Sequence, residues 1–212
     1  MCKTLIRRTI LAGLGLAASA AFAHTGEMGH AHGADAFTSF AQGALHPLTG
    51  LDHLAAMVSV GLWSALTARD GSRAMWTAPA AFAMTLLVGA LLGLAGLSLP
   101  GVEPMIAASL LVMGLLVSTR TALPTVAGGA LVAVFALFHG LAHGAELGGG
   151  QGTAALAGMV ISTAALHAVG IALGLALRRQ PASAGRWAPR LTGLGVAIFG
   201  VTLLTPAIAS AF

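Results

Sequence analysis

The chain has 212 residues, of which 57% are hydrophobic and only 8% are charged, and its formal net charge is +4. A soluble globular domain carries roughly 25% charged residues, so this chain has too little polar surface to cover a water-facing globule. Its basic residues form no clustered stripe of the kind that nucleic-acid binding needs. The composition therefore indicates an integral membrane protein and excludes a nucleic-acid partner.

The first 23 residues have the pattern of a cleavable secretory signal peptide. The first eight residues include three basic side chains, a short apolar stretch covers residues 9–20, and Ala21-Phe22-Ala23 fits an A-x-A cleavage site. An uncleaved signal anchor is the alternative, and it would add one span without changing the orientation of the others.

A polar, glycine-rich leader over residues 24–36 follows, with His24, His30 and His32. If cleavage frees His24, its α-amine and imidazole could chelate a metal ion together, so we interpret this periplasmic leader as a metal-capture arm. A flexible spacer is the alternative. Because Cys2 is the only cysteine, the mature chain would have no disulfide and no thiolate metal ligand.

Six apolar segments of spanning length, about 20 residues each, follow the leader. We expect them near residues 38–66, 75–97, 103–119, 122–145, 153–177 and 190–210. In the first and longest segment, Pro47 and Gly50 are expected to bend or break the helix. The predicted fold class is an all-α integral membrane protein, in which a six-transmembrane-helix bundle over residues 37–212 follows a cleavable signal peptide.

The arginines of the mature chain predict its orientation. All seven lie in alternate connectors: Arg69, Arg73, Arg120, Arg178, Arg179, Arg186 and Arg190. The connectors between them contain no lysine or arginine. By the positive-inside rule these arginines face the cytoplasm, and Trp63, Trp76 and Trp187 lie on the same side as interfacial anchors. We therefore expect a multi-pass protein of the bacterial cytoplasmic (inner) membrane whose mature N- and C-termini are both periplasmic.

Glycines four residues apart recur in the apolar segments. The pairs are Gly89 and Gly93, Gly140 and Gly144, and Gly170 and Gly174. Such pairs let helix backbones approach closely, and we interpret them as ordinary tight packing. No nucleotide-binding motif is present, so the chain itself is not expected to hydrolyse ATP.

Two polar motifs lie within the apolar segments: HPLTGLDH at residues 46–53 and FHGLAHGAE at residues 138–146. Ionisable residues inside a membrane are costly and mark functional sites. At 100° per residue, His139 and His143 lie about 40° apart on a helix, and Glu146 lies about 20° from His139. Histidines spaced i, i+4 can bind one metal ion together.

The first motif repeats this arrangement less regularly. His46 and His53 are seven residues apart and share a helical face, whereas Asp52 points about 100° away from His53 if the helix is regular. We expect Asp52 to accept a hydrogen bond from His53 and to orient its ring. His167 lies alone in the fifth segment, where an interhelical hydrogen-bonding role is the alternative. Met57 is interpreted as packing rather than as a ligand.

The predicted orientation places the ionisable groups at different depths. Toward the outer face lie His46, Glu103 and Glu146, and nearer the midplane lie His53, His139 and His167. An ion path needs ligands spaced in this way, each binding well enough to accept the ion and weakly enough to release it. For the two glutamates, ordinary solvation at loop edges is the alternative.

Imidazole and carboxylate ligands without thiolate suit a borderline divalent ion such as Ni²⁺ or Co²⁺, and would also bind Zn²⁺ or Cu²⁺. The candidate metal-binding residues are His24, His30, His32, His46, Asp52, His53, Glu103, His139, His143, Glu146 and His167. We interpret these residues as the ion path of a metal permease. The ion is then the transported substrate, so we predict no prosthetic group and no catalytic residue.

Two alternatives to a permease remain. A membrane-embedded Zn-dependent hydrolase could use Asp52, His53, His139 and His143 to hold a metal ion with an open position for water. Such an enzyme needs one tight cluster and a general base, whereas these ligands are spread over two depths. A non-transporting accessory or metal-sensing membrane protein is the second alternative.

Four segments in this order, HPLTGLDHLAAMVSVGLW, PGVEPMIAASLL, FHGLAHGAE and STAALHAVG, resemble the HupE/UreJ family of nickel/cobalt permeases. The resemblance covers the whole mature chain. It implies uptake of Ni²⁺ or Co²⁺ that supplies a hydrogenase, urease or cobalamin metal-insertion pathway. The positions that match the family's motifs are His46, Asp52, His53, His139, His143 and Glu146, with Glu103 and His167 at its other polar positions.

Overall fold

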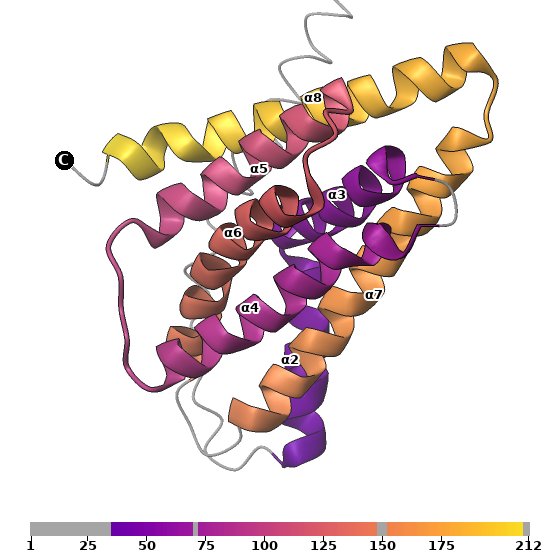
Figure 1. Cartoon of the computed structure of the whole chain (residues 1–212). Helices are drawn as coiled ribbons and strands as arrows, with labels where there is room; N and C mark the ends of the chain where they lie inside the picture. The colour runs from indigo at the N-terminus through magenta and orange to yellow at the C-terminus, as the bar shows by residue number, and fades with distance from the viewer. Residues whose placement is uncertain (1–34, 70–71, 148–151, 210–212) are drawn as a thin grey trace, which may run out of the picture. The chain divides into compact units, whose positions relative to one another are not determined.

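The computed structural model describes residues 35–69, 72–147 and 152–209 (Figure 1). Every regular element within these residues is helical. In chain order they are α2 (Ala36–Thr49), α3 (Leu51–Thr67), the 3₁₀ helix η2 (Arg73–Trp76), α4 (Thr77–Leu94), α5 (Val102–Thr119), α6 (Thr125–Glu146), α7 (Gly152–Arg178) and α8 (Ala182–Ala209). The expected signal peptide and the three histidines of the leader lie outside the described residues.

Five of the described helical stretches are long and apolar enough to cross a membrane. They are Arg73–Leu94, Val102–Thr119, Thr125–Glu146, Gly152–Arg178 and Gly185–Pro206. The chain is thus an all-helical, multi-pass membrane protein, as predicted. The apolar helix Leu51–Thr67 has 17 residues, about 26 Å of rise, which is shorter than the roughly 30 Å hydrocarbon core. A sixth span formed by α2 and α3 together stays a prediction.

The first apolar segment is broken at Gly50, as expected. This residue has extended backbone angles, φ −85° and ψ 114°, between the end of α2 and the start of α3. Pro47 lies inside the last turn of α2 rather than at the break. At the other end of α2, the carboxylate of Asp35 caps the helix by accepting a 2.7 Å hydrogen bond from the N–H of Thr38. The break lies between the two histidines of the first motif.

Glycines bring α4 and α6 into backbone contact along their length. Gly89 and Gly93 on α4 face Gly140 and Gly144 on α6, and a Cβ added at Gly144 would lie 2.1 Å from the carbonyl oxygen of Ala90. Gly89 lies near Gly140, and Gly93, one turn later on α4, lies near Gly144, one turn later on α6. The two helices are therefore parallel. Tight packing, the interpretation taken from the sequence, is confirmed for these two pairs.

The third glycine pair, Gly170 and Gly174, lies on α7 and packs against α3, while Gly43 of α2 packs against an earlier part of α7. A Cβ added at Gly170 would lie 2.2 Å from the carbonyl oxygen of Val58 on α3, and one added at Gly43 on α2 would lie 2.0 Å from that of Ala155. Gly174 likewise faces α3. From α2 to α3 the chain therefore runs parallel to α7, although Gly50 breaks the helix between them.

The helices α5 and α8 also pack closely together, and they are antiparallel. Gly114 lies against Gly193 and Ala197, whereas Gly200 lies against Leu111, earlier in α5. Figure 1 shows α5 beside α8 and α4 beside α6. These directions agree with a chain in which α2 and α3 together and each later long helix cross a membrane alternately.

Hydrogen bonds tie helix ends together where the arginines lie. Arg178 at the end of α7 donates from Nη1 to the carbonyl oxygens of Ala65 and Ala68, both at 2.9 Å. The indole N–H of Trp63 donates to the carbonyl oxygen of Thr121 at 2.9 Å. The ends of α3, α5 and α7 are therefore joined at one end of the bundle.

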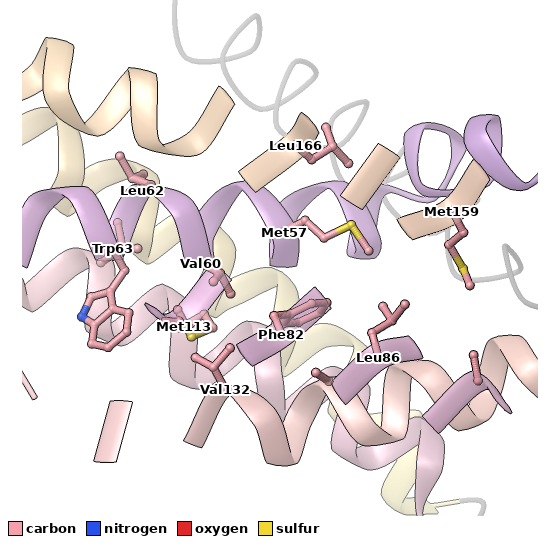
Figure 2. Close-up of a cluster of buried hydrophobic side chains, with 14 of the residues drawn as sticks. Met57, Val60, Leu62, Trp63, Phe82, Leu86, Met113, Val132, Met159 and Leu166 are labelled. Atoms are coloured by element: carbon pink, nitrogen blue, oxygen red, sulfur yellow. The ribbon is translucent and has the colours of Figure 1, made fainter. Parts of the chain in front are cut away.

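Apolar side chains from α3, α4, α5, α6 and α7 form one buried core (Figure 2). Met57, Val60, Phe82, Met113 and Val132 are each at most 2% exposed. The position of Met57 in this core agrees with its interpretation as a packing residue. The core extends from Trp63, at the arginine-bearing end of the bundle, to Leu86, which lies against Gly140 of α6 near the histidines described next.

Candidate metal centre

Three histidines from distant parts of the chain come together between α2, α3 and α6. In His46, His53 and His143, one nitrogen of each ring lies within 4.8 Å of those of the other two. The ring of His143 is centred 4.8 Å from that of His46 and 4.6 Å from that of His53. Two imidazole nitrogens bound tetrahedrally at roughly 2.1 Å are about 3.4 Å apart. Small side-chain movements would therefore let these three rings bind one ion.

The helix break at Gly50 positions two of the three rings. His46 lies in the last turn of α2 and His53 in the first turn of α3, and their rings meet edge to face at 5.4 Å. A Cβ added at Gly50 would lie 2.9 Å from Nδ1 of His53 and 3.0 Å from Oδ1 of Asp52. Glycine thus leaves room for these side chains, a role that its sequence position as a helix breaker did not reveal.

Asp52 fixes the ring of His53. Its Oδ1 lies 2.9 Å from Nδ1 of His53, and both side chains are buried. An ionised carboxylate can only accept a hydrogen bond, so Nδ1 carries the proton and Nε2 presents its lone pair. The hydrogen bond expected from the sequence is therefore present, and it selects the tautomer that binds metal through Nε2.

His139 lies one turn before His143 on α6 and is fully buried. Its Nδ1 donates a 2.9 Å hydrogen bond to the carbonyl oxygen of Phe135, which again leaves Nε2 as the acceptor nitrogen. The ring is centred 5.7 Å from that of His53. His139 therefore adjoins the three-histidine group without belonging to it.

His143 carries a buried polar atom that no described residue satisfies. Its Nδ1 lies 3.9 Å from Oε2 of Glu146, a long contact, and Nε2 has no hydrogen-bond partner among the described residues. A buried polar atom without a partner costs about 1–3 kcal/mol, and a bound ion or water molecule would remove that cost. The donor set and this atom together fit a divalent metal ion.

The structure does not bring His167 into the group. The ring of Phe82 lies between it and His139, centred 5.1 Å from His167 and 5.6 Å from His139. Nε2 of His167 and Oγ1 of the neighbouring Thr163 are buried without hydrogen-bond partners among the described residues. Phe82 was missed in the sequence because one phenylalanine in an apolar helix carries no distinguishing signal.

The two candidate glutamates lie at the periphery. Glu146 is exposed at the end of α6, beside His143, and Glu103 is exposed in the first turn of α5, outside the three-histidine group. The leader histidines lie outside the described residues. His46 and His53 lie beside the break between α2 and α3, and His143 lies near the end of α6, away from the arginines. The backbone of His167 instead lies level with Gly61, in the second half of α3, so the predicted depth series stays a prediction.

Comparison with known proteins shows which family the chain resembles. The family model described as "HupE / UreJ protein" matches residues 12–203. Protein HupE of Rhizobium leguminosarum bv. viciae is 41% identical over 197 residues, which cover 92% of this chain and 95% of that protein. No solved structure matches the chain.

Proposed function

The chain belongs to the HupE/UreJ family, which is implicated in nickel and cobalt transport, and we propose that it carries Ni²⁺ or Co²⁺ inward across the cytoplasmic membrane. The observation that carries this proposal is the group of His46, His53 and His143, which can offer three imidazoles to one ion inside an apolar bundle. Imidazole ligands without thiolate suit borderline divalent ions.

The ligands differ in exposure in the way that a path requires. His46 is half-buried, His53 and His143 are buried, and His139 lies next to them at full burial. An ion entering at His46 would exchange water for imidazoles stepwise. The carboxylate of Asp52, held against His53, would offset the cost of placing a divalent charge in a low-dielectric region.

The remaining candidates would have supporting roles. Glu146 and Glu103, both exposed, would attract the ion at the outer face, and the leader histidines would capture it. His167 would be a later position beyond Phe82. In this proposal both termini are periplasmic, and the imported metal supplies a hydrogenase, urease or cobalamin pathway.

Family membership favours a carrier over the zinc-dependent hydrolase. A hydrolase needs a carboxylate beside an open coordination position to act as general base. The buried carboxylate nearest the histidines, Asp52, is instead held against Nδ1 of His53, where it orients a ligand.

Uptake of radioactive nickel by cells that lack their own nickel importer tests this proposal. We expect cells with the wild-type chain to accumulate nickel and cells with His143→Ala to lose nearly all of that uptake. Thr202→Ala is the matched control, because Thr202 is exposed on α8 and bonds only within its own helix. Equal uptake by wild-type and His143→Ala chains at equal membrane abundance would refute the proposed site.

A further inference from the structure

A cavity of about 410 Å³ lies at the arginine-bearing end of the bundle. Its walls come from the end of α3, from η2 and the start of α4, and from the start of α6. The polar side chains in its described lining include Ser64, Thr67, Arg69, Ser72, Thr77 and Thr125. It is therefore separate from the histidine cluster and has a different chemical character.

One face of α3 connects the two sites. His53, Met57, Val60 and Ser64 follow one another at intervals of four, three and four residues, so they share a face over about 16 Å of helix. The order along this face is an imidazole, two buried apolar side chains, and then a hydroxyl that lines the cavity.

The opposing face of α6 has a similar order, in which imidazoles come first, then an apolar side chain, then a residue that lines the cavity. Read from its C-terminal end, His143 and His139 are followed by Val132 and then by Gly128, which lines the cavity. The separation between His139 and Gly128 is eleven residues, the same as that between His53 and Ser64 on α3. Two helices therefore lead from the same group of imidazoles to the same cavity.

An apolar layer closes the space between the two sites. Met57 and Val60 from α3, Phe82 from α4 and Val132 from α6 belong to one packed core and are each at most 1% exposed (Figure 2). Phe82 also contacts the rings of His139 and His167. A hydrophobic constriction of this kind excludes water and can act as a gate.

The cavity is large enough to hold several water molecules. Its described polar side chains are hydroxyls and the guanidinium of Arg69. Borderline divalent ions prefer imidazole to hydroxyl ligands, so these groups would bind such an ion weakly.

We propose that this cavity is the inner vestibule in which a hydrated divalent cation is released, and that the layer of Met57, Val60, Phe82 and Val132 is the closed barrier above it. This inference rests on the proposed function. Release needs weak binding, which hydroxyls and water provide. The guanidinium of Arg69 in the lining disfavours retention of a cation and opposes its return.

Thiol labelling tests the vestibule. In a Cys2→Ser background, which removes the only native cysteine, single Ser64→Cys and Thr67→Cys chains are exposed to a charged, membrane-impermeant methanethiosulfonate. The reagent is applied to inverted vesicles and, separately, to intact spheroplasts. Val60→Cys samples the apolar layer. Thr119→Cys is the matched control, since Thr119 is exposed at the end of α5 and does not line the cavity.

We expect Ser64→Cys and Thr67→Cys to react in inverted vesicles but not in spheroplasts, and Val60→Cys to react in neither. In inverted vesicles loaded with nickel, modification should slow nickel release, which corresponds to uptake by cells, at least tenfold in the two cavity variants and leave it unchanged in Thr119→Cys. Thr67→Cys decides the result if Ser64→Cys fails to insert. Lack of reaction, or reaction without slower release, overturns the vestibule. Absence of nickel uptake by the unlabelled Cys2→Ser chain and the wild type would instead refute the proposed function.

Discussion

At the scale of single residues, hydrogen bonds decide which histidine nitrogens can bind metal. Asp52 and the carbonyl oxygen of Phe135 hold the Nδ1 atoms of His53 and His139, each at 2.9 Å. In both rings the lone pair is then on Nε2. The metal site is therefore prepared by groups that need not touch the ion.

Asp52→Asn separates the charge of this residue from its shape. The asparagine oxygen can still accept from His53, but the negative charge that offsets the ion is lost. We expect the metal concentration for half-maximal uptake to rise by about 10- to 100-fold, as for other residues that orient metal ligands. Asp35→Asn is the matched control, because Asp35 caps α2 away from the cluster and asparagine caps helices equally well. An unchanged half-maximal concentration in Asp52→Asn would show that the charge is not needed.

Uptake should depend on pH through competition between protons and metal. Imidazole binds metal only when neutral, so at limiting metal we expect uptake to fall as the pH drops from about 7 to about 5. Saturating metal should restore most of it. The hydrogen bond from the N–H of Thr38 lowers the pKa of the Asp35 carboxyl. This carboxylate, which caps α2, therefore stays ionised over this pH range, and its protonation cannot explain the fall in uptake. Uptake that is constant between these pH values at limiting metal would contradict imidazole ligation.

At the scale of helices, the close approach of α4 and α6 depends on glycine. In Gly140→Ala the added Cβ would lie 2.2 Å from the carbonyl oxygen of Leu86, so the backbones must separate. We expect a loss of stability of about 1–3 kcal/mol, measured as a lower midpoint of thermal unfolding in detergent. Gly129→Ala on the same helix is the control, since its Cβ would meet only Thr77 Cγ2 at 3.7 Å. Equal midpoints for the two variants would show that this contact does not stabilise the bundle.

The sequence was sufficient to locate most of the helices and the break in the first segment. Hydrophobic segments and short connectors mark helices directly, and Gly50 marks the break between α2 and α3. The start of α8 was expected too late, because the helix begins at Ala182 with turns that are not apolar and that include Arg186. Pro47, which was expected to bend or break the helix together with Gly50, lies inside the last turn of α2. Likewise, an i, i+4 pair such as His139 and His143 is evident from spacing alone.

The meeting of His46 and His53 with His143 could not be derived from spacing, because it depends on how α2, α3 and α6 pack. The contacts of Phe82 with His139 and His167 likewise depend on how α4, α6 and α7 pack. Spacing describes one helix at a time, whereas a metal site is made by side chains from several helices. For this reason the sequence placed His139 and His167 in one ligand set, and the structure separates them.

At the scale of the whole molecule, orientation is the property on which the direction of transport depends. The arginines lie at one end and the group of His46, His53 and His143 toward the other, and the packed helix pairs have the directions that alternate crossings require. We expect reporter fusions after Gly71 and Gly185 to be cytoplasmic and a fusion after Gly149 to be periplasmic. A cytoplasmic signal from the Gly149 fusion would overturn both the topology and the assignment of the histidines to the outer half.

The most direct test of a metal permease is uptake by the purified protein. Wild-type, His53→Ala and His143→Ala chains are reconstituted into liposomes at equal abundance, and entry of Ni²⁺ and of Co²⁺ is followed with a metal indicator inside. We predict saturable entry of one or both ions with the wild type and nearly none with either variant. Entry at the rate of protein-free liposomes for the wild type, or at the wild-type rate for both variants, would contradict the account.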